Sequence, residues 1–277
     1  MSMVTNTGMR MSILDYDFMR TAFAASGIVA VMAGIVGVFL VGRGQTFAGH
    51  ALSHVGFAGA TAAGLFGIAP IWGMILFTLA AGVGMGALGE RLSGRDVAIG
   101  VILALALGFG LLFLHYYTAF ATQATALLFG NVLAVRGGTV VLLAGLAVVS
   151  LTALAFISRP LLFATLQPEL AEAKGVPLPA VGIAFMAVVA LTVSASVQIV
   201  GVLLVFALMV GPAAAAERLT TTLRAALTVA AALALLEAWT GIVVAYYTDW
   251  PTSFCISALS ALVYFAVLAV PRRAAEV

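Results

Sequence analysis

The chain has 277 residues, of which 64% are hydrophobic and only 8% are charged, and its mean hydropathy is +1.22. A soluble domain normally carries about 25% charged residues, so most of this chain must lie in membrane lipid. The formal net charge of +2 is too small to indicate a nucleic-acid partner. Cys255 is the single cysteine, which excludes an internal disulfide framework. Composition therefore predicts an all-α, polytopic transmembrane helical bundle.

Apolar runs follow one another through the first part of the chain, after a polar N-terminal segment at 1–17. A spanning helix needs about 20 apolar residues. Runs of this kind lie at 18–41, 46–67, 69–88, 97–117 and 139–157. The short sequence TALLFGNVLAV at 125–135 is better explained as an interfacial or re-entrant helix than as a full span.

The second part of the chain begins with its longest polar interruption, at 158–179. The apolar stretch that follows, 181–216, is too long for one span, and SASVQ at 194–198 could fold it into a hairpin. Two further runs lie at 225–246 and 252–270. We expect nine spans if 181–216 crosses twice and eight if one run is re-entrant, within a single transmembrane domain that covers 1–277.

Basic residues indicate which connections face the cytoplasm. One alternating topology places nine of them on the same side: Arg43, Arg91, Arg95, Arg159, Lys174, Arg218, Arg224, Arg272 and Arg273. By the positive-inside rule this side is cytoplasmic. The 158–179 loop is then cytoplasmic, and YYTDWPTS at 246–253 lies outside. Nine spans would place the N-terminus outside.

Glycines indicate how closely the spans pack. Gly82 and Gly86 form a GxxxG pair, and Gly34, Gly37, Gly108 and Gly110 also lie within spans. Small residues let helix backbones approach closely in lipid. The pattern predicts a tightly packed bundle, but glycine-rich spans are too general to indicate a function.

Two histidines stand out in the second run, within the sequence GHALSHVGFAG. His50 and His54 are four residues apart, so on a helix they share one face. Imidazole is a ligand for Zn, Cu, Fe and Ni, which makes the pair a candidate metal site. The alternative is a packing pair that hydrogen-bonds to backbone carbonyls. Two ligands alone do not complete a site, and ligation of haem is a weaker possibility.

Two carboxylates lie where few charges occur. Glu237 is near the middle of its run, and it is either a buried, hydrogen-bonded carboxyl or a residue of a transport pathway. Asp249 is at the outer end of the same run. It is either a turn residue ahead of Pro251 or a carboxylate that attracts cations to the pathway.

The sequence LQPELAEAKGV at 166–176 is typical of a short amphipathic helix. Pro168 and Glu169 suit its first turn, and Gly175 suits the position after its end. This helix is either a solvated loop element or a docking site for a cytoplasmic partner. The chain has no GxxxxGK[ST] sequence, so it cannot hydrolyse a nucleotide by the P-loop route. Any energy source is therefore another polypeptide or an ion gradient.

Four sequence blocks, in order along the chain, resemble the membrane permease of bacterial zinc/manganese ABC importers. GVFLVGRGQTFAGHALSHVGFAG is similar to the family's arginine-bearing turn and the histidine segment after it. LLFGNVLAV and LQPELAEAKGV resemble two further family motifs. The fourth block pairs QIVGVLLVFALMVGPAAAA with YYTDWPTS. The order and spacing of the blocks match over nearly the whole chain.

The resemblance implies a multi-pass transport subunit of the bacterial cytoplasmic (inner) membrane rather than an enzyme. Its implied partners are membrane lipid, a cytoplasmic ATP-binding subunit, an extracytoplasmic metal-binding protein and a second permease copy in a homodimer. The family's coupling loop matches 166–176, with Pro168, Glu169, Ala171 and Gly175 as its contact residues. We expect transported Zn²⁺ or Mn²⁺ and no permanently bound cofactor.

His54 matches the family's histidine, but His50 stands where the family usually has aspartate. Two imidazoles make a softer site than aspartate with histidine, which favours zinc over manganese. His50, His54 and Asp249 are therefore the candidate pathway residues. The alternatives are an importer of the same architecture for iron or a chelate, a gradient-driven secondary transporter or channel, and a haem-containing redox enzyme.

Overall fold

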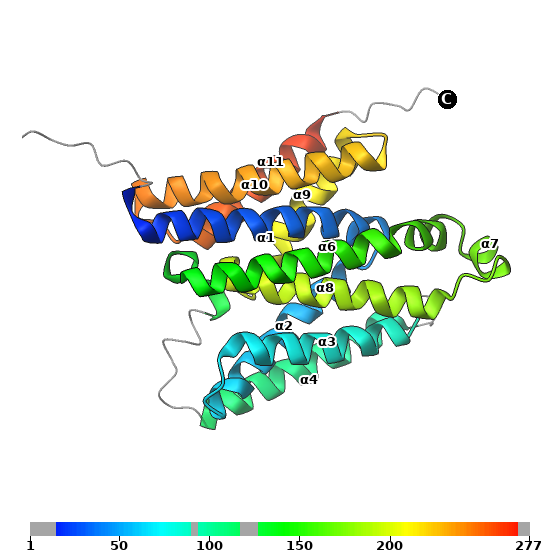
Figure 1. The fold of residues 1–277 in the computed structure, drawn as a ribbon, viewed down its shortest axis with the longest axis horizontal. Coiled ribbons are helices and arrows are strands. Elements are labelled where there is room, and N and C mark those ends of the chain that lie inside the picture. Colours follow the sequence, from blue (N-terminus) through cyan, green and yellow to red (C-terminus); the bar gives the residue numbers. More distant parts are fainter. Residues whose placement is uncertain (1–14, 90–93, 117–126, 271–277) are drawn as a thin grey trace, which may run out of the picture.

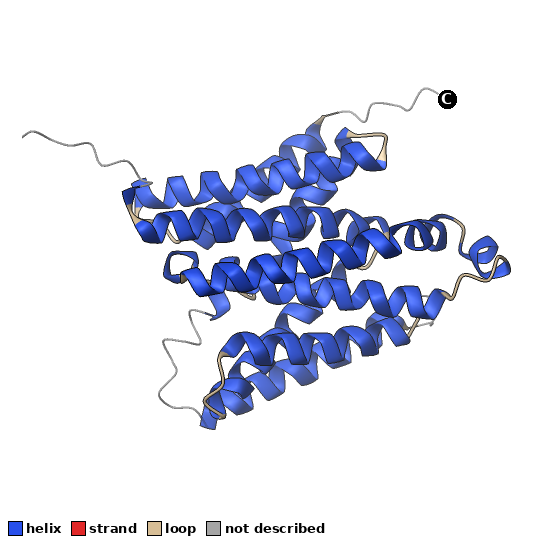
Figure 2. Ribbon diagram, viewed as in Figure 1, coloured by secondary structure: helices blue, strands red, loops and turns tan. Residues whose placement is uncertain are grey.

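The computed structural model describes residues 15–89, 94–116 and 127–270, and within these ranges the chain is helical, with no strand (Figure 2). The expected polar segment at 1–17 lies almost wholly outside them. The elements are α1 (Asp17–Gly42), α2 (Thr46–Leu65), α3 (Pro70–Ala87), α4 (Arg95–Tyr116), the 3₁₀ helix η3 (Val132–Ala134), α6 (Gly137–Leu166), α7 (Pro168–Ala173), α8 (Leu178–Val200), α9 (Val205–Leu219), α10 (Leu223–Thr248) and α11 (Thr252–Ala269). The predicted all-α class is confirmed.

Long helices run side by side along the molecule, and the short helix α7 lies at one end (Figure 1). Seven of the described helices are long and apolar enough to cross a membrane: α1, α3, α4, α6, α8, α10 and α11. The expected runs at 46–67 and within 181–216 correspond to α2 and α9, which are not among the seven. α9 has only 15 residues, and α2, although 20 residues long, is rich in glycine and polar residues. Because most of α2 is buried by other helices, it does not need a lipid-compatible surface.

The stretch 181–216 divides into two helices, as expected, but at a different place. α8 continues through SASVQ because the hydroxyls of Ser194 and Ser196 donate to carbonyls four residues earlier, at 3.0 and 2.8 Å. The helix ends before Gly201, which has a positive φ of 80°. The predicted bend at 194–198 is therefore wrong by several residues. The expected end of the fifth run at 157 is also wrong, since α6 continues through Pro160 to Leu166.

Two irregular segments, 127–134 and 201–204, satisfy part of each other's backbone hydrogen bonding. The N–H groups of Val202 and Leu203 donate to the carbonyls of Leu127 and Leu128, at 3.1 and 3.2 Å. Irregular backbone at membrane depth requires such partners. The expectation of a short, non-spanning segment at 125–135 is confirmed for residues 127–135, and the rest of it lies outside the described ranges.

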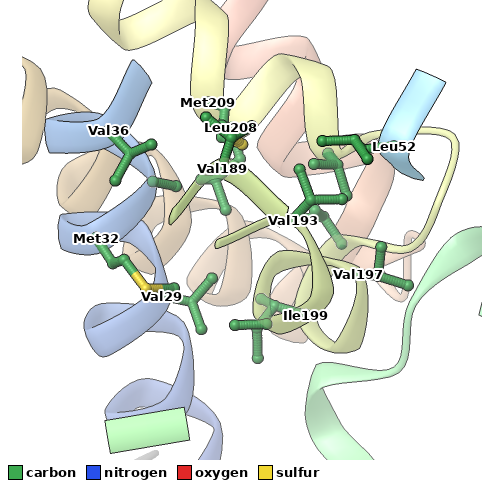
Figure 3. Close-up of a cluster of buried hydrophobic side chains, with 14 of the residues drawn as sticks. Val29, Met32, Val36, Leu52, Val189, Val193, Val197, Ile199, Leu208 and Met209 are labelled. Carbon is green, nitrogen blue, oxygen red and sulfur yellow. The ribbon is translucent and has the colours of Figure 1, made fainter. Parts of the chain in front are cut away.

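The buried core centres on α8, whose side chains meet those of α1, α2 and α9 (Figure 3). Figure 3 shows Val189 of α8 on the side of Val29 and Met32 of α1, and Val193 and Val197 of α8 on the side of Leu52 of α2. These side chains are among the buried hydrophobic residues that form one large cluster. α8 therefore lies in the middle of this core, whereas α4 and α10 pack on α2 and α1 instead.

Glycines bring several helix backbones together. A Cβ added at Gly82 would lie 2.8 Å from the Met186 carbonyl oxygen, and one at Gly86 would lie 2.6 Å from Ile183 Cα, so this GxxxG pair packs against α8 as predicted. At the crossing of α2 and α3, Gly59 and Gly73 each face the other's carbonyl oxygen. Either added Cβ would clash with backbone.

The crossing of α2 and α3 predicts opposite effects for two alanine substitutions in α3. Gly73→Ala should lower the free energy of unfolding by about 1–3 kcal/mol, because the methyl group meets backbone that cannot move away. Gly84→Ala is the control, because nothing lies within 4 Å of its added Cβ. It should be neutral or stabilise the protein by up to about 1 kcal/mol. Thermal unfolding of the detergent-purified variants measures both effects, and equal midpoints would contradict the close crossing.

Candidate functional site

The two histidines lie in the first half of α2 and share one face of it, as the spacing predicts. Their imidazole ring centroids are 4.9 Å apart with the ring planes at 85°. Both side chains are partly exposed, whereas Leu52 and Ser53 between them are buried on the other faces of the helix. α2 thus buries its small and apolar residues and leaves the imidazole pair accessible.

The surroundings of the pair leave its ring nitrogens without protein partners. Phe206 of α9 packs edge-to-face on His50, with ring centroids 6.0 Å apart. Neither imidazole hydrogen-bonds to another residue in the described part of the chain, and His54 Nδ1 is buried without a partner. The alternative of a packing pair bonded to carbonyls receives no support here. Buried polar atoms nearly always have a partner, so this nitrogen is open to a hydrogen bond or to a ligand.

The histidine pair does not belong to a larger cluster of potential metal ligands within the described residues. In the described ranges, no group of three or more histidine, cysteine, aspartate or glutamate residues could hold a metal ion together. Asp249 lies far from the histidines: α1 and α10 are antiparallel, with Gly34 against Ala230 and Gly27 against Trp239. The end of α10 is therefore at the opposite end of the bundle from the start of α2. The structure brings His50 and His54 together and leaves Asp249 apart.

Asp249 occupies a turn in which the backbone is left-handed. It caps the C-terminus of α10 with a backbone in the left-handed region, at φ 56°. Among the non-glycine residues that the structure describes, it alone has a positive φ. Its side chain is exposed, and the Trp250 N–H donates to Thr248 Oγ1 at 3.4 Å. Aspartate is one of the few residues that adopt this conformation readily. The geometry accounts for Asp249 as a turn residue and leaves its carboxylate facing solvent.

Arg43, which the sequence analysis connected with topology and with the family's arginine-bearing turn, joins three helices at the end of the bundle where α2 begins. Its Nη1 donates to Thr165 Oγ1 at 2.6 Å and to the Leu161 carbonyl at 3.2 Å, both in α6. Its guanidinium also lies 5.5 Å from the centre of the Phe185 ring of α8. Burial, and secondly the charge of Arg95, lowers the pKa of Arg43 to about 10, so it remains positive at neutral pH. A lone arginine in a sequence gives no signal of such contacts.

The short helix α7 lies at the same end and is shorter than the predicted 166–176. Pro168 begins it, Ala171 is fully buried beneath it, and Glu169 is exposed. The N–H of Val176 donates to the Ala171 carbonyl at 3.0 Å, and Gly175 has φ 82°, which together form a glycine C-cap. Nothing lies within 4 Å of a Cβ added at Gly175. The helix therefore presents an open, polar surface.

Glu237 is buried inside the bundle, 3% exposed, and neither carboxylate oxygen meets a hydrogen-bond partner by geometry in the described ranges. Ser260 of α11 is its polar neighbour, but that hydroxyl donates to the Ala207 carbonyl at 2.8 Å. Glu237 is not part of any group of three or more potential metal ligands in the described part of the chain. It is a buried carboxyl outside the histidine site.

Seven of the described helices are long and apolar enough to cross a membrane, and they pack around a buried core. They define a multi-pass helical protein of the inner membrane. The chain belongs to the ABC 3 transport family, whose family model matches residues 15–271. This match confirms the resemblance to metal ABC importer permeases that the four sequence blocks indicated.

Two curated relatives cover nearly the whole chain. It is 28% identical over 258 residues to the manganese transport system membrane protein MntC of Halalkalibacterium halodurans, which covers 91% of this chain and 88% of that protein. It is also 28% identical to a probable iron transport system membrane protein of Haemophilus influenzae, over 92% of this chain and 94% of that one. Both relatives are named as membrane proteins of metal transport systems.

A solved structure has the same fold. PsaBC from Streptococcus pneumoniae in complex with Fab contains a chain that superposes with a TM-score of 0.84 at 23% identity. The alignment covers 94% of this chain and 95% of that chain. At this identity the likeness establishes the arrangement of the helices.

The turn at Asp249 predicts how its substitutions affect stability. Asp249→Asn and Asp249→Gly should leave stability nearly unchanged, because both residues tolerate a positive φ. Asp249→Val should lower the free energy of unfolding by about 1–2 kcal/mol, because a β-branched side chain is strained there. Thermal unfolding of the three variants tests this. A loss with Asn as large as with Val would mean that the carboxylate, rather than the backbone, stabilises the turn.

Proposed function

We propose that this permease forms the translocation pathway of an ATP-driven importer for divalent metal ions, and that His50 and His54 bind the ion in transit. The observation that carries the proposal is the accessible imidazole pair, 4.9 Å between centroids, with a buried ring nitrogen that has no protein partner in the described ranges. Neutral imidazole is a common ligand of transition metals. In a membrane permease, a pathway residue is the direct explanation for such a pair.

Zinc is the proposed cargo, with manganese as the principal alternative. The two relatives are named for manganese and iron, so family membership favours no zinc-specific function. The argument for zinc is chemical: His50 stands where the resembled family usually has aspartate, and two imidazoles suit a borderline ion better than a hard one. Manganese prefers at least one oxygen ligand. Iron or a chelate would use the same architecture.

A second copy of the chain would complete the site. Structural zinc sites hold four ligands in tetrahedral geometry, and one chain offers two imidazoles. A two-fold axis near the exposed histidine face would bring a second pair toward the first. Four ligands held permanently would trap the ion, so a transport site would use only some of them at a time. We therefore include a homodimer in the proposal.

The remaining partners follow from what the chain lacks. It has no P-loop, so we propose that a separate cytoplasmic subunit hydrolyses ATP and contacts the exposed face of α7. Pro168, Glu169 and Gly175 would form that contact, while buried Ala171 supports it from beneath. An extracytoplasmic binding protein would deliver the ion near Asp249, at the opposite end. A gradient-driven transporter would need neither partner, so co-purification with an ATP-binding subunit distinguishes the two.

Competitive uptake of ⁶⁵Zn and ⁵⁴Mn into proteoliposomes or cells tests the histidine pair. His50→Ala/His54→Ala should lower uptake at least about tenfold, because the ion loses both imidazoles. His50→Asp should restore the family's usual pair and shift preference from Zn²⁺ toward Mn²⁺. His115→Ala, at an exposed histidine near the end of α4, is the matched control and should transport normally. Normal zinc uptake by the double-alanine variant would contradict the site.

Two tryptophan substitutions test the contact at α7. Gly175→Trp should abolish uptake and binding of the ATPase subunit, because a bulky side chain would obstruct the docking surface. Gly67→Trp controls for backbone strain, since Gly67 has φ 68° and equally open surroundings but lies between α2 and α3 at the other end. Gly175→Asn, which tolerates the positive φ, should retain partial function. An equal loss in both tryptophan variants would attribute the effect to strain and not to docking.

A further inference from the structure

Two cavities lie along the same pair of helices, α3 and α4. The first has a volume of about 510 Å³ and lies at the end of the bundle that carries Arg43 and α7. Its polar lining comes from Arg43, Gln45, Arg95 and Glu172. The ends of α3 and α8 supply apolar and small residues around them. The cavity is thus a polar pocket with two cations and one described carboxylate.

The second cavity is an apolar groove of about 330 Å³ between α2, α3 and α4. Its lining is apolar throughout and includes Val55, Ala58, Phe77, Ala81, Ile102 and Phe109. Phe109 and Leu105 are exposed, so the groove is accessible from the side of the bundle. In a membrane that side faces hydrocarbon chains.

Helical periodicity places the two cavities in line. On α4, Arg95 of the pocket and Ile102 and Phe109 of the groove are seven residues apart, so all three lie on one face. At 1.5 Å per residue, Arg95 and Phe109 are separated by about 21 Å. On α3, Phe77 and Ala81 of the groove and Leu88 of the pocket likewise share a face. One elongated molecule could occupy both cavities.

The charges define the chemistry of that molecule. Arg95 makes no hydrogen bond or ion pair with the described residues, and its Nε is buried without a partner. Arg43 is held in place by Thr165 and contributes a second positive charge. The carboxylate of Glu172, which lines the same pocket, would repel an anion that carries more than one negative charge. A ligand with one negative charge at its head and an apolar tail fits this arrangement.

We propose that a singly charged anionic phospholipid binds here, with its phosphate at Arg95 and Arg43 and an acyl chain in the α2–α3–α4 groove. The half-thickness of the hydrocarbon core, about 15 Å, fits within the distance from pocket to groove end. The head of the lipid would also lie beside Pro168 and Glu172 of α7, which line the same pocket. The proposal does not depend on which ion the permease transports.

Lipid binding to the purified full-length permease tests this site. Native mass spectrometry with dioleoyl phosphatidylglycerol and dioleoyl phosphatidylcholine measures the affinity for each, and thermal unfolding provides a second readout. We expect phosphatidylglycerol to bind about tenfold more tightly, as charge-assisted hydrogen bonds favour the anion. Soluble glycerol 3-phosphate forms a third arm, because it offers the same phosphate without a tail.

Matched variants separate the head and tail contributions. Arg95→Gln should remove the preference for phosphatidylglycerol, whereas Arg224→Gln, at an exposed arginine of α10, should keep it. Ala80→Phe, at an exposed residue lining the groove, should weaken binding of both lipids several-fold. Ala155→Phe, exposed on α6, should not. Equal affinity for the two lipids, an unchanged preference in Arg95→Gln, or equal stabilisation by glycerol 3-phosphate would overturn the proposal.

Discussion

Lipid offers no hydrogen bonds to a polypeptide backbone, and this constraint shapes the structure at each place where a helix ends. The segments 127–134 and 201–204 interrupt helices, and their backbones bond to each other through Leu127, Leu128, Val202 and Leu203. Ser253, in the first turn of α11, donates to the Phe129 carbonyl at the same place. Three parts of the chain that are distant in sequence are thereby fixed together, and α8 ends and α9 begins at this junction.

The same constraint explains why the fold was predictable and where prediction was wrong. Apolar runs of sufficient length must become helices in a membrane, so the bounds of α1, α3, α4, α10 and α11 agree with the sequence to within a few residues. The polar sequence SASVQ wrongly predicted a bend, because serine hydroxyls can donate hydrogen bonds to carbonyls of their own helix. The predicted fifth run ended at 157, before the polar interruption, yet α6 continues to Leu166. Local composition does not determine these positions.

The sequence predicts that the two histidines share one face of a helix, but it does not predict which residues surround them. Spacing alone places His50 and His54 together, whereas the contact with Phe206 depends on how α9 packs after the break at Gly201. The contacts of Arg43 with Leu161, Thr165 and Phe185 cross more than a hundred residues of sequence. A single sequence without its tertiary structure contains no signal for such contacts.

The burial of α2 has a consequence for how the protein enters the membrane. α2 has 20 uncharged residues but does not reach the hydropathy of the seven membrane-crossing helices. A helix of this kind partitions poorly into lipid alone. Its small and glycine-rich surface is covered only once α3, α4 and α8 are present, and Gly59 must meet Gly73 for that to occur. Insertion of α2 therefore depends on the helices that cover it, and a substitution in α3, α4 or α8 would impair it as a substitution in α2 itself would.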